Sequence, residues 1–288
     1  MKPFAIRLLL RLFAALPFRL AQAAGGLLGW LHWRLPNRLR RISHGNIERC
    51  YAQRHPRWRR QLLRASLVET GRTLAESAWF WGRTPAQVLP LVREVRGFEH
   101  LDRARRAGRG IVFATPHLGA WELSAAFGAQ HIPLTVLFRP PRLAALRDAL
   151  LRARERLGMH PVPTDGAGVR ALHRALRRGE AVGVLPDQQP RGGVGLYAPF
   201  FGQPALTMTL LSRLAHRSGA PVIFAAMERL PRGRGFRLHL RPADAAVGDA
   251  DMTTAAAAVN REVEKCIALA PAQYMWNYKR FQGTPPQE

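Results

Sequence analysis

From residue 93 onward, short runs of aliphatic and β-branched residues alternate with longer amphipathic stretches. The runs predict strands at 111–115, 134–138, 182–185, 222–227 and 236–240. The stretches predict helices at 119–129, 142–157, 167–178, 205–218 and 252–269. The runs 111–115 and 182–185 contain almost no polar residues, which is typical of strands buried on both faces. The pattern therefore predicts an α/β domain over 93–288, with a mostly parallel sheet flanked by helices.

The first 33 residues are apolar but are interrupted by arginines. Their longest run without Arg or Lys, 20–33, has fourteen residues, which is short of the roughly 20 that a transmembrane helix needs. Trp30 and Trp33 suit a membrane interface. We interpret 1–33 as a membrane anchor, either a tilted span or a helix lying in the headgroup plane. A signal peptide and a buried helical hairpin are the alternatives.

The segment 34–92 follows as a basic, membrane-proximal region, with a helical pattern over 61–92. Ten arginines fall within 34–64. Next to an apolar anchor, such a cluster indicates the cytoplasmic face of a membrane and binding to anionic headgroups. A solvated helix face and a nucleic-acid-binding arm are the alternatives.

The composition strengthens the expectation of an anionic partner. The formal net charge is +25, from 44 Lys and Arg against 19 Asp and Glu, and such a field attracts polyanions. Hydrophobic residues make up 47% of the chain, enough to build a sizeable core, so we expect a folded chain rather than global disorder. Cys50 and Cys266 lie far apart and form neither a disulfide framework nor a CxxC pair. This cysteine usage fits a reducing, cytoplasm-facing environment, and no metal or cofactor is expected.

Three ionisable residues follow predicted strands. His117 comes after 111–115, Arg139 after 134–138, and Asp187 after 182–185. The carboxyl edge of an open α/β sheet is where ligands bind, so we expect the three side chains to face one site.

The stretch "ATPHLGAWELSAAF" also places Glu122 near His117. Five residues on a continuous helix separate side chains by about 140°, so the two can meet only if His117 precedes the helix and Glu122 lies in its first turn. Pro116 and Gly119 favour such a start. Glu122 would then orient His117 as a general base. Alternatively, Glu122 caps the helix and His117 is an ordinary loop histidine.

The sequence offers no activated nucleophile beside His117. There is no GxSxG motif, and neither cysteine is near in sequence. A basic His117 would therefore activate a hydroxyl of the substrate, with backbone amides at the start of helix 119–129, or an arginine, stabilising the oxyanion. The segment "RGGVG" at 191–195 is a weak candidate phosphate loop, because no helix follows it.

Five ordered motifs carry a resemblance over about 97–281. They are "HLGAWE", "LFRP", "LRRGEAVGVLPDQQ", "YAPFFGQPALTMT" and "APAQYMWNYKRF". Together they resemble the LpxL/LpxM (HtrB/MsbB) family of lipid A late acyltransferases, which act in lipopolysaccharide biosynthesis. The resemblance implies an enzyme on the cytoplasmic face of the inner membrane. It would move a fatty acyl chain from acyl carrier protein, or coenzyme A, to a hydroxyl of a phosphorylated, acylated glucosamine disaccharide.

The resemblance also implies the site residues. They are the catalytic pair His117 and Glu122, and the substrate-binding residues Arg154, Asp187, Arg139 and Arg156. The sequence departs from the family pattern at Phe138, where tyrosine is frequent, and at Gln189, where a second acid is frequent. The alternatives are an acyltransferase for another lipid, such as a phosphatidylinositol mannoside or an ornithine lipid, and a non-enzymatic basic protein that binds membranes or nucleic acid. We expect no nucleic-acid partner.

Overall fold

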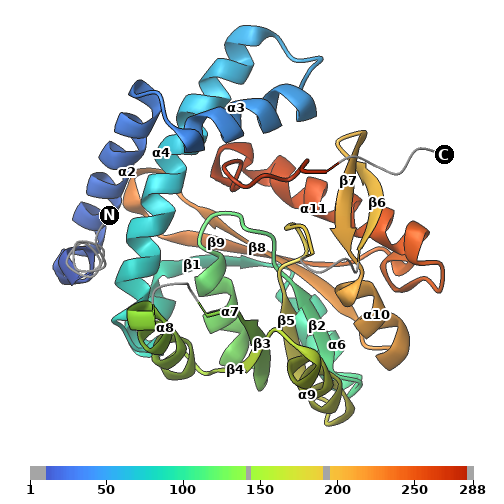
Figure 1. Ribbon diagram of the computed structural model, residues 1–288. Helices are drawn as coiled ribbons and strands as arrows, with labels where there is room; N and C mark the ends of the chain where they lie inside the picture. Colours follow the sequence, from blue (N-terminus) through green and yellow to red (C-terminus); the bar gives the residue numbers. More distant parts are fainter. Residues whose placement is uncertain (1–10, 141–143, 191–194, 284–288) are drawn as a thin grey trace.

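The computed structural model describes residues 11–140, 144–190 and 195–283. A seven-stranded sheet lies at its centre, in the strand order β1-β9-β8-β2-β5-β3-β4 (Figure 1). The strands are β1 Val92–Arg96, β2 Ile111–Ala114, β3 Leu134–Phe138, β4 Met159–Pro163, β5 Ala181–Val184, β8 Val222–Arg229 and β9 Phe236–Pro242. Strands β8, β2, β5, β3 and β4 run parallel, whereas β9 is antiparallel to β8 and β1 is parallel to β9.

Helices cover both faces of this sheet. They are α6 Phe98–Arg106, α7 Trp121–Ala129, α8 Ala144–Arg156, α9 Gly166–Arg177, α10 Leu210–Ser218 and α11 Met252–Leu269. Alternate residues of β2 point into two separate cores: Val112 packs with α9, α10 and α11, and Phe113 packs with α6 and α7. Because both faces are covered, β2 is apolar throughout. The predicted mostly parallel sheet flanked by helices is confirmed.

Several predicted elements differ from those observed. The predicted helix 205–218 is wrong in its first part, because β7 (Gln203–Met208) pairs with β6 (Gly195–Phe200) in an antiparallel hairpin and α10 begins only at Leu210. Strands β1 and β4 were not predicted. The sequence of β4, MHPVP, contains two prolines, which are tolerated because β4 is an edge strand. The first two residues of the predicted helix 142–157 lie outside the described residues.

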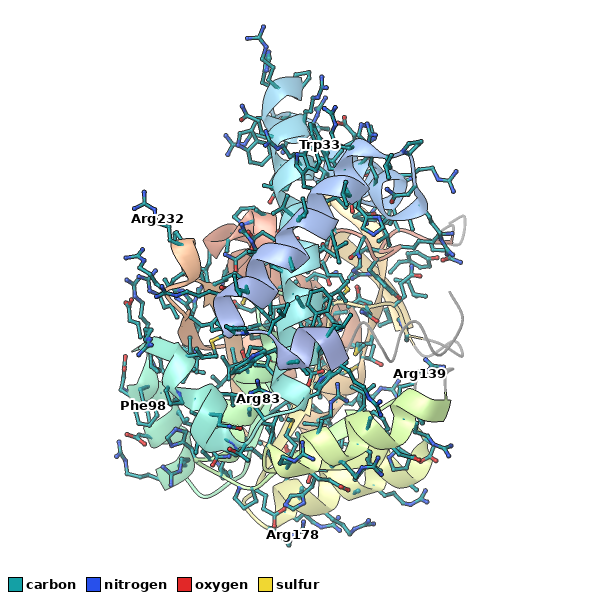
Figure 2. All side chains as sticks on the ribbon, turned by 90° about the vertical axis from the view of Figure 1, so that its left-hand side faces the viewer. Trp33, Arg83, Phe98, Arg139, Arg178 and Arg232 are labelled. Atoms are coloured by element: carbon teal, nitrogen blue, oxygen red, sulfur yellow. The ribbon has the colours of Figure 1, made fainter. Side chains whose placement is uncertain are left out.

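The N-terminal part of the chain is helical: α2 Phe18–Arg34, α3 Arg38–Cys50, α4 Pro56–Trp81 and α5 Pro85–Val88. Helix α2 lies across α4 (Figure 2). Small residues allow this contact: a Cβ on Gly29 would lie 2.2 Å from the Leu67 carbonyl oxygen, and one on Gly25 would lie 2.5 Å from that of Gly71. Close approach of two helices through glycines explains why α2 is rich in them.

The interpretation of 1–33 as a tilted membrane span is not supported. In the described part of the chain, no helix is long and apolar enough to cross a membrane. Helix α2 buries its small residues against α4, while Leu20, Leu27 and Leu31 remain exposed. Residues 1–10 of the expected anchor lie outside the described residues.

Candidate active site

Two of the predicted site residues meet at the carboxyl edge of the sheet. Strands β2 and β5 are parallel neighbours, with Ala114 paired to Val184. His117 and Asp187 each follow shortly after the end of their strand, so the fold brings them together across this edge. The expectation that these two residues converge is confirmed.

Asp187 holds the imidazole of His117 through two hydrogen bonds. The distance between His117 Nδ1 and Asp187 Oδ1 is 2.7 Å, and the backbone N–H of His117 donates to Asp187 Oδ2 at 2.9 Å. Asp187 is buried, and the His117 side chain is 14% exposed. Burial alone would raise the pKa of Asp187, but the charge of His117 and these hydrogen bonds lower it overall. Asp187 therefore remains a carboxylate.

The second ring nitrogen of His117 faces the side chain of Gln188. Because a carboxylate only accepts hydrogen bonds, Nδ1 carries the proton and Nε2 carries the lone pair of a neutral ring. Gln188 Nε2 lies 3.1 Å from His117 Nε2. The ring of Trp121 contacts the imidazole edge-to-face, with centroids 5.1 Å apart. The arrangement leaves Nε2 suited to accept a proton from a hydroxyl.

Glu122 does not hold the imidazole, so that part of the sequence interpretation is wrong. Glu122 lies in the first turn of α7, as expected, but its Oε1 accepts from Arg154 Nη2 at 2.6 Å and its Oε2 from Arg154 Nε at 3.3 Å. Helix α7 begins at Trp121, after the left-handed Gly119, and this start turns Trp121 rather than Glu122 toward His117. A catalytic role for Glu122 remains a prediction.

Arg154 is committed to this ion pair within a largely buried setting. Burial alone would lower its pKa, but the charge of Glu122 and the hydrogen bonds to it raise the pKa overall. Its guanidinium also lies over the ring of Phe138, 5.4 Å from the centroid. A role of Arg154 in binding substrate stays a prediction, and its Nε and Nη2 already donate to Glu122.

The other two predicted arginines lie outside both clusters. Arg156 is exposed and donates through Nη1 to the carbonyl oxygen of Trp81 at 3.1 Å, where α4 ends. Arg139 is exposed just after β3, next to the region where α8 begins (Figure 2). The site therefore consists of His117–Asp187 and, behind Trp121, Glu122–Arg154. The candidate loop 191–195 lies mostly outside the described residues.

A small apolar cavity lies between α7 and the sheet. Its volume is about 60 Å³, and Trp121, Glu122 and Arg154 form one wall of it. The rest of the lining is mostly apolar, with Phe113 and Val136 among its residues. Ligand pockets usually measure roughly 300–1,000 Å³, so this cavity is too small, as it stands, to enclose an acyl chain.

The turn before α7 is fixed by the C-terminal part of the chain. The N–H of Gly119 donates to the Gln273 carbonyl at 3.0 Å, and that of Ala120 to the Met227 carbonyl at 3.1 Å. The N–H of Met275 donates to the carbonyl of His117 at 3.0 Å. The amides of Gly119 and Ala120, the first two residues of the predicted helix 119–129 whose opening amides are candidate oxyanion donors, are thus already paired.

A buried ion-pair network supports the same turn. Arg229, at the end of β8, pairs with Glu76 and Glu69 of α4 and donates to the hydroxyl of Thr73 at 2.8 Å. Thr73 in turn donates to the carbonyl of Gly119 at 3.3 Å. No local pattern in the sequence predicts this network, because the acids lie more than 150 residues from Arg229.

Neither cysteine is placed to act as a nucleophile. Cys50 and Cys266 are both buried. Burial raises the pKa of Cys266 to about 12, and burial also raises the pKa of Cys50. Both thiols therefore remain protonated and take no part in the site.

The fold and the site define an α/β protein with an aspartate-held histidine at the carboxyl edge of its sheet, an arrangement suited to activating a hydroxyl. The chain belongs to the bacterial lipid A biosynthesis acyltransferase family, whose model matches residues 3–283. It is therefore an acyltransferase of this family, and the resemblance drawn from its motifs is confirmed.

Three relatives illustrate the range of the family. The chain is 32% identical to the lipid A biosynthesis lauroyltransferase of Escherichia coli K12, over 95% of this chain and 89% of the relative. It is 29% identical to the lipid A biosynthesis palmitoleoyltransferase of the same organism, over 96% and 90%. It is also 30% identical to a phosphatidylinositol mannoside acyltransferase of Mycobacterium tuberculosis, but over only 58% of this chain and 54% of the relative.

Proposed function

We propose that this acyltransferase moves a fatty acyl chain from the thioester of acyl carrier protein to a hydroxyl of a phosphorylated lipid A precursor, with His117 as the general base. The observation that carries the proposal is the hydrogen bond between Asp187 and Nδ1, which leaves the Nε2 lone pair at the edge of the sheet. The lipid A transferases that match almost the whole chain support the acceptor.

The reaction needs one proton acceptor and no enzyme nucleophile. His117 Nε2 removes the proton from the acceptor hydroxyl while its oxygen attacks the thioester carbonyl. The tetrahedral intermediate collapses, the carbon–sulfur bond breaks, and the thiolate takes the proton from Nε2. Asp187 stabilises the imidazolium between the two transfers. General-base assistance of this kind is typically worth about 10²–10⁴-fold in rate.

The side chain of Gln188 is placed to act as an oxyanion donor. Its amide nitrogen lies 3.1 Å from the nitrogen that takes the proton, so it lies next to the reacting atoms. Once the acceptor hydroxyl forms a hydrogen bond with His117 Nε2, the amide of Gln188 can donate to the oxyanion of the tetrahedral intermediate. Removing one such donor typically costs about 10²–10³-fold in rate. The N–H groups of Gly119 and Ala120 are already bonded to the carbonyls of Gln273 and Met227, so neither competes with Gln188 for this role.

A second acceptor class is a mannosylated phosphatidylinositol. The Mycobacterium tuberculosis relative favours it. The match covers little more than half of either chain, and we therefore place the lipid A precursor first.

The outward face of α2 supports attachment of the protein to the cytoplasmic face of the inner membrane. Leu20, Leu27 and Leu31 are 56%, 58% and 39% exposed, and their spacing places them on one face of the helix. An apolar stripe in a strongly cationic protein is typical of a helix that lies in the headgroup plane. We expect Leu27→Glu to lower binding to anionic vesicles, whereas Leu269→Glu, at a similarly apolar exposed position on α11, should not. Equal binding of both variants and wild type would contradict this attachment.

The experiment that tests the function uses the purified protein and mass spectrometry. Acyl carrier protein and coenzyme A thioesters of the same acyl chain are each offered with a bis-phosphorylated, acylated glucosamine disaccharide or with a mannosylated phosphatidylinositol. We expect an ester product on the disaccharide, formed faster from the carrier-protein thioester. A product on the mannosylated lipid alone would refute the proposed acceptor, and equal rates from both thioesters would refute the proposed donor.

A further inference from the structure

A second, larger cleft lies between α3 and the C-terminal segment 277–282, which we call the α3 cleft. Its volume is about 500 Å³, within the roughly 300–1,000 Å³ of typical ligand pockets. Helix α3 lies over the C-terminal part of the chain in Figure 1. The residues that line the cleft include Arg38, Ile42, Gln189, Asn277 and Lys279.

The α3 cleft is cationic. Arg38 and Lys279 line it from α3 and from the C-terminal segment, both are exposed, and neither forms an ion pair within the described residues. Among the described lining residues, none is acidic. A second hollow of about 580 Å³ on the other side of Arg38 is lined by Arg40 and Arg41 as well. The two hollows together attract an anion to Arg38.

The walls of the α3 cleft are held in place by hydrogen bonds. Asn46 of α3 is buried and donates to the carbonyls of Trp276 and Tyr278, at 2.7 and 2.6 Å. Gln189 donates through Nε2 to the carbonyls of Arg280 and Gln282, at 3.2 and 2.6 Å. The cleft is therefore preorganised, which reduces the ordering cost of binding.

The α3 cleft adjoins the catalytic histidine. Gln189 lines it, and the preceding residue, Gln188, contacts His117 Nε2. Asn277 also lies shortly after Met275, whose backbone bonds to that of His117. The cleft is therefore connected to the base through Gln188–Gln189 and through the segment from Met275 to Asn277.

We propose that the α3 cleft binds a phosphate group on the sugar headgroup of the acceptor, through Arg38 and Lys279. The proposal rests on the proposed function, and it assigns phosphate recognition to this cleft rather than to Arg154, which is paired with Glu122. Free inorganic phosphate and the phosphorylated headgroup would present the same group to the cleft, so the experiment measures the two ligands separately.

The test compares two double variants with the same change in charge. Arg38→Gln/Lys279→Gln removes both cleft cations. Arg57→Gln/Arg60→Gln removes two exposed arginines of α4 that do not line the cleft. Both are assayed in neutral detergent micelles, so that anionic lipid surfaces play no part. The readouts are KM and equilibrium binding for the bis-phosphorylated disaccharide and for its dephosphorylated form.

For the cleft variant, we expect KM and Kd for the phosphorylated acceptor to rise by about tenfold or more, because charge-assisted hydrogen bonds are lost. Values for the dephosphorylated acceptor should stay within about twofold, as for most surface substitutions. The control variant should behave as wild type on both. Inorganic phosphate should compete with the phosphorylated acceptor for binding to the wild-type protein. It should not compete for binding to the cleft variant.

If KM and Kd of the cleft variant rose equally for both acceptors, the proposal would be overturned. The same rise in the control variant would also overturn it. Competition by inorganic phosphate that survives in the cleft variant would do the same. Binding is measured without any acyl donor, so the outcomes are separable. A wild type that binds phosphate through the cleft but transfers no acyl group would refute the proposed function alone. Acyl transfer by a protein that binds the phosphorylated and the dephosphorylated acceptor equally well would refute only the assignment of phosphate binding to the cleft.

Discussion

Replacing Asp187 with asparagine tests which carboxylate orients the base. Both oxygens of Asp187 accept from His117, one from the backbone N–H at 2.9 Å and one from Nδ1–H at 2.7 Å. An asparagine keeps the shape but has only one oxygen. If its NH₂ group faces the ring, Nδ1 must accept, and the proton moves to Nε2. If it faces the backbone, two donors oppose each other in a buried position.

The expected loss of kcat follows from the change in the tautomer of His117. With the proton on Nε2, His117 cannot take a proton from the acceptor, and the whole general-base contribution of about 10²–10⁴-fold is lost. In hydrolases with a comparable triad, the same change lowers kcat by about 10⁴-fold. We therefore expect Asp187→Asn to lower kcat by about 10³-fold or more, with little change in KM.

The assay is steady-state acyl transfer followed by mass spectrometry, with Glu122→Gln as the matched control. Glu122→Gln weakens the pair with Arg154 but leaves the imidazole and Asp187 untouched, so it should cost less in kcat than Asp187→Asn. Thermal unfolding of each variant shows whether lost activity reflects lost structure. The reverse order, with Glu122→Gln the more damaging variant in a folded protein, would refute the assignment of Asp187 as the orienting carboxylate.

The effect of Asp187→Asn on stability should depend on pH. The pKa of Asp187 is lower in the folded protein than in the unfolded chain, so the unfolded state binds more protons in this range and stability falls as the pH falls. The contribution of Asp187 is present above the ordinary aspartate pKa of about 3.9 and is lost below it. The difference in unfolding free energy between wild type and Asp187→Asn should therefore shrink on acidification below about pH 4; a constant difference from pH 7 to pH 3 would contradict this.

Two further substitutions test the scaffold behind the site. Gly119→Ala should destabilise the protein by roughly 1–3 kcal/mol or more, because Gly119 has φ +56° and its Cβ would lie 1.9 Å from the Met227 carbonyl oxygen. Gly45→Ala, in open space on α3, should instead be neutral or stabilising in urea unfolding. Arg229→Met should cost about 3–5 kcal/mol, because it leaves Glu76 buried without a cation. Adding Glu76→Gln should restore part of that loss, and no restoration would contradict the ion-pair explanation.

The sequence predicted most of the central sheet because burial there is continuous. Strands β2, β3, β5, β8 and β9 lie where the apolar runs are, and α11 spans the residues expected for it. Strand β1, at one edge, reads VREVR and carries too many charges to show a strand pattern. The hairpin β6–β7 was missed because the small and threonine residues of 203–208 fit a helix or a strand, and only the pairing across the hairpin decides between them.

The sequence predicted which residues form the site, but not which of them pair with each other. Position after a strand placed His117 and Asp187 correctly, because neighbouring parallel strands end at one edge. Spacing suggested Glu122 as the partner, since it is close in sequence. The actual partner comes from another strand, 70 residues away. Local spacing cannot show that Arg154, on α8, takes Glu122 instead.

The general-base role of His117, which passes the proton of the acceptor hydroxyl to the departing thiolate, is the core of the proposed mechanism. Its most direct test is single-turnover acyl transfer, with donor and acceptor both saturating, by wild type and by His117→Ala. We expect the variant to bind the acceptor normally, to unfold at the wild-type temperature, and to transfer at least about 100-fold more slowly. A folded His117→Ala protein that retains more than about a tenth of the wild-type rate would contradict the account.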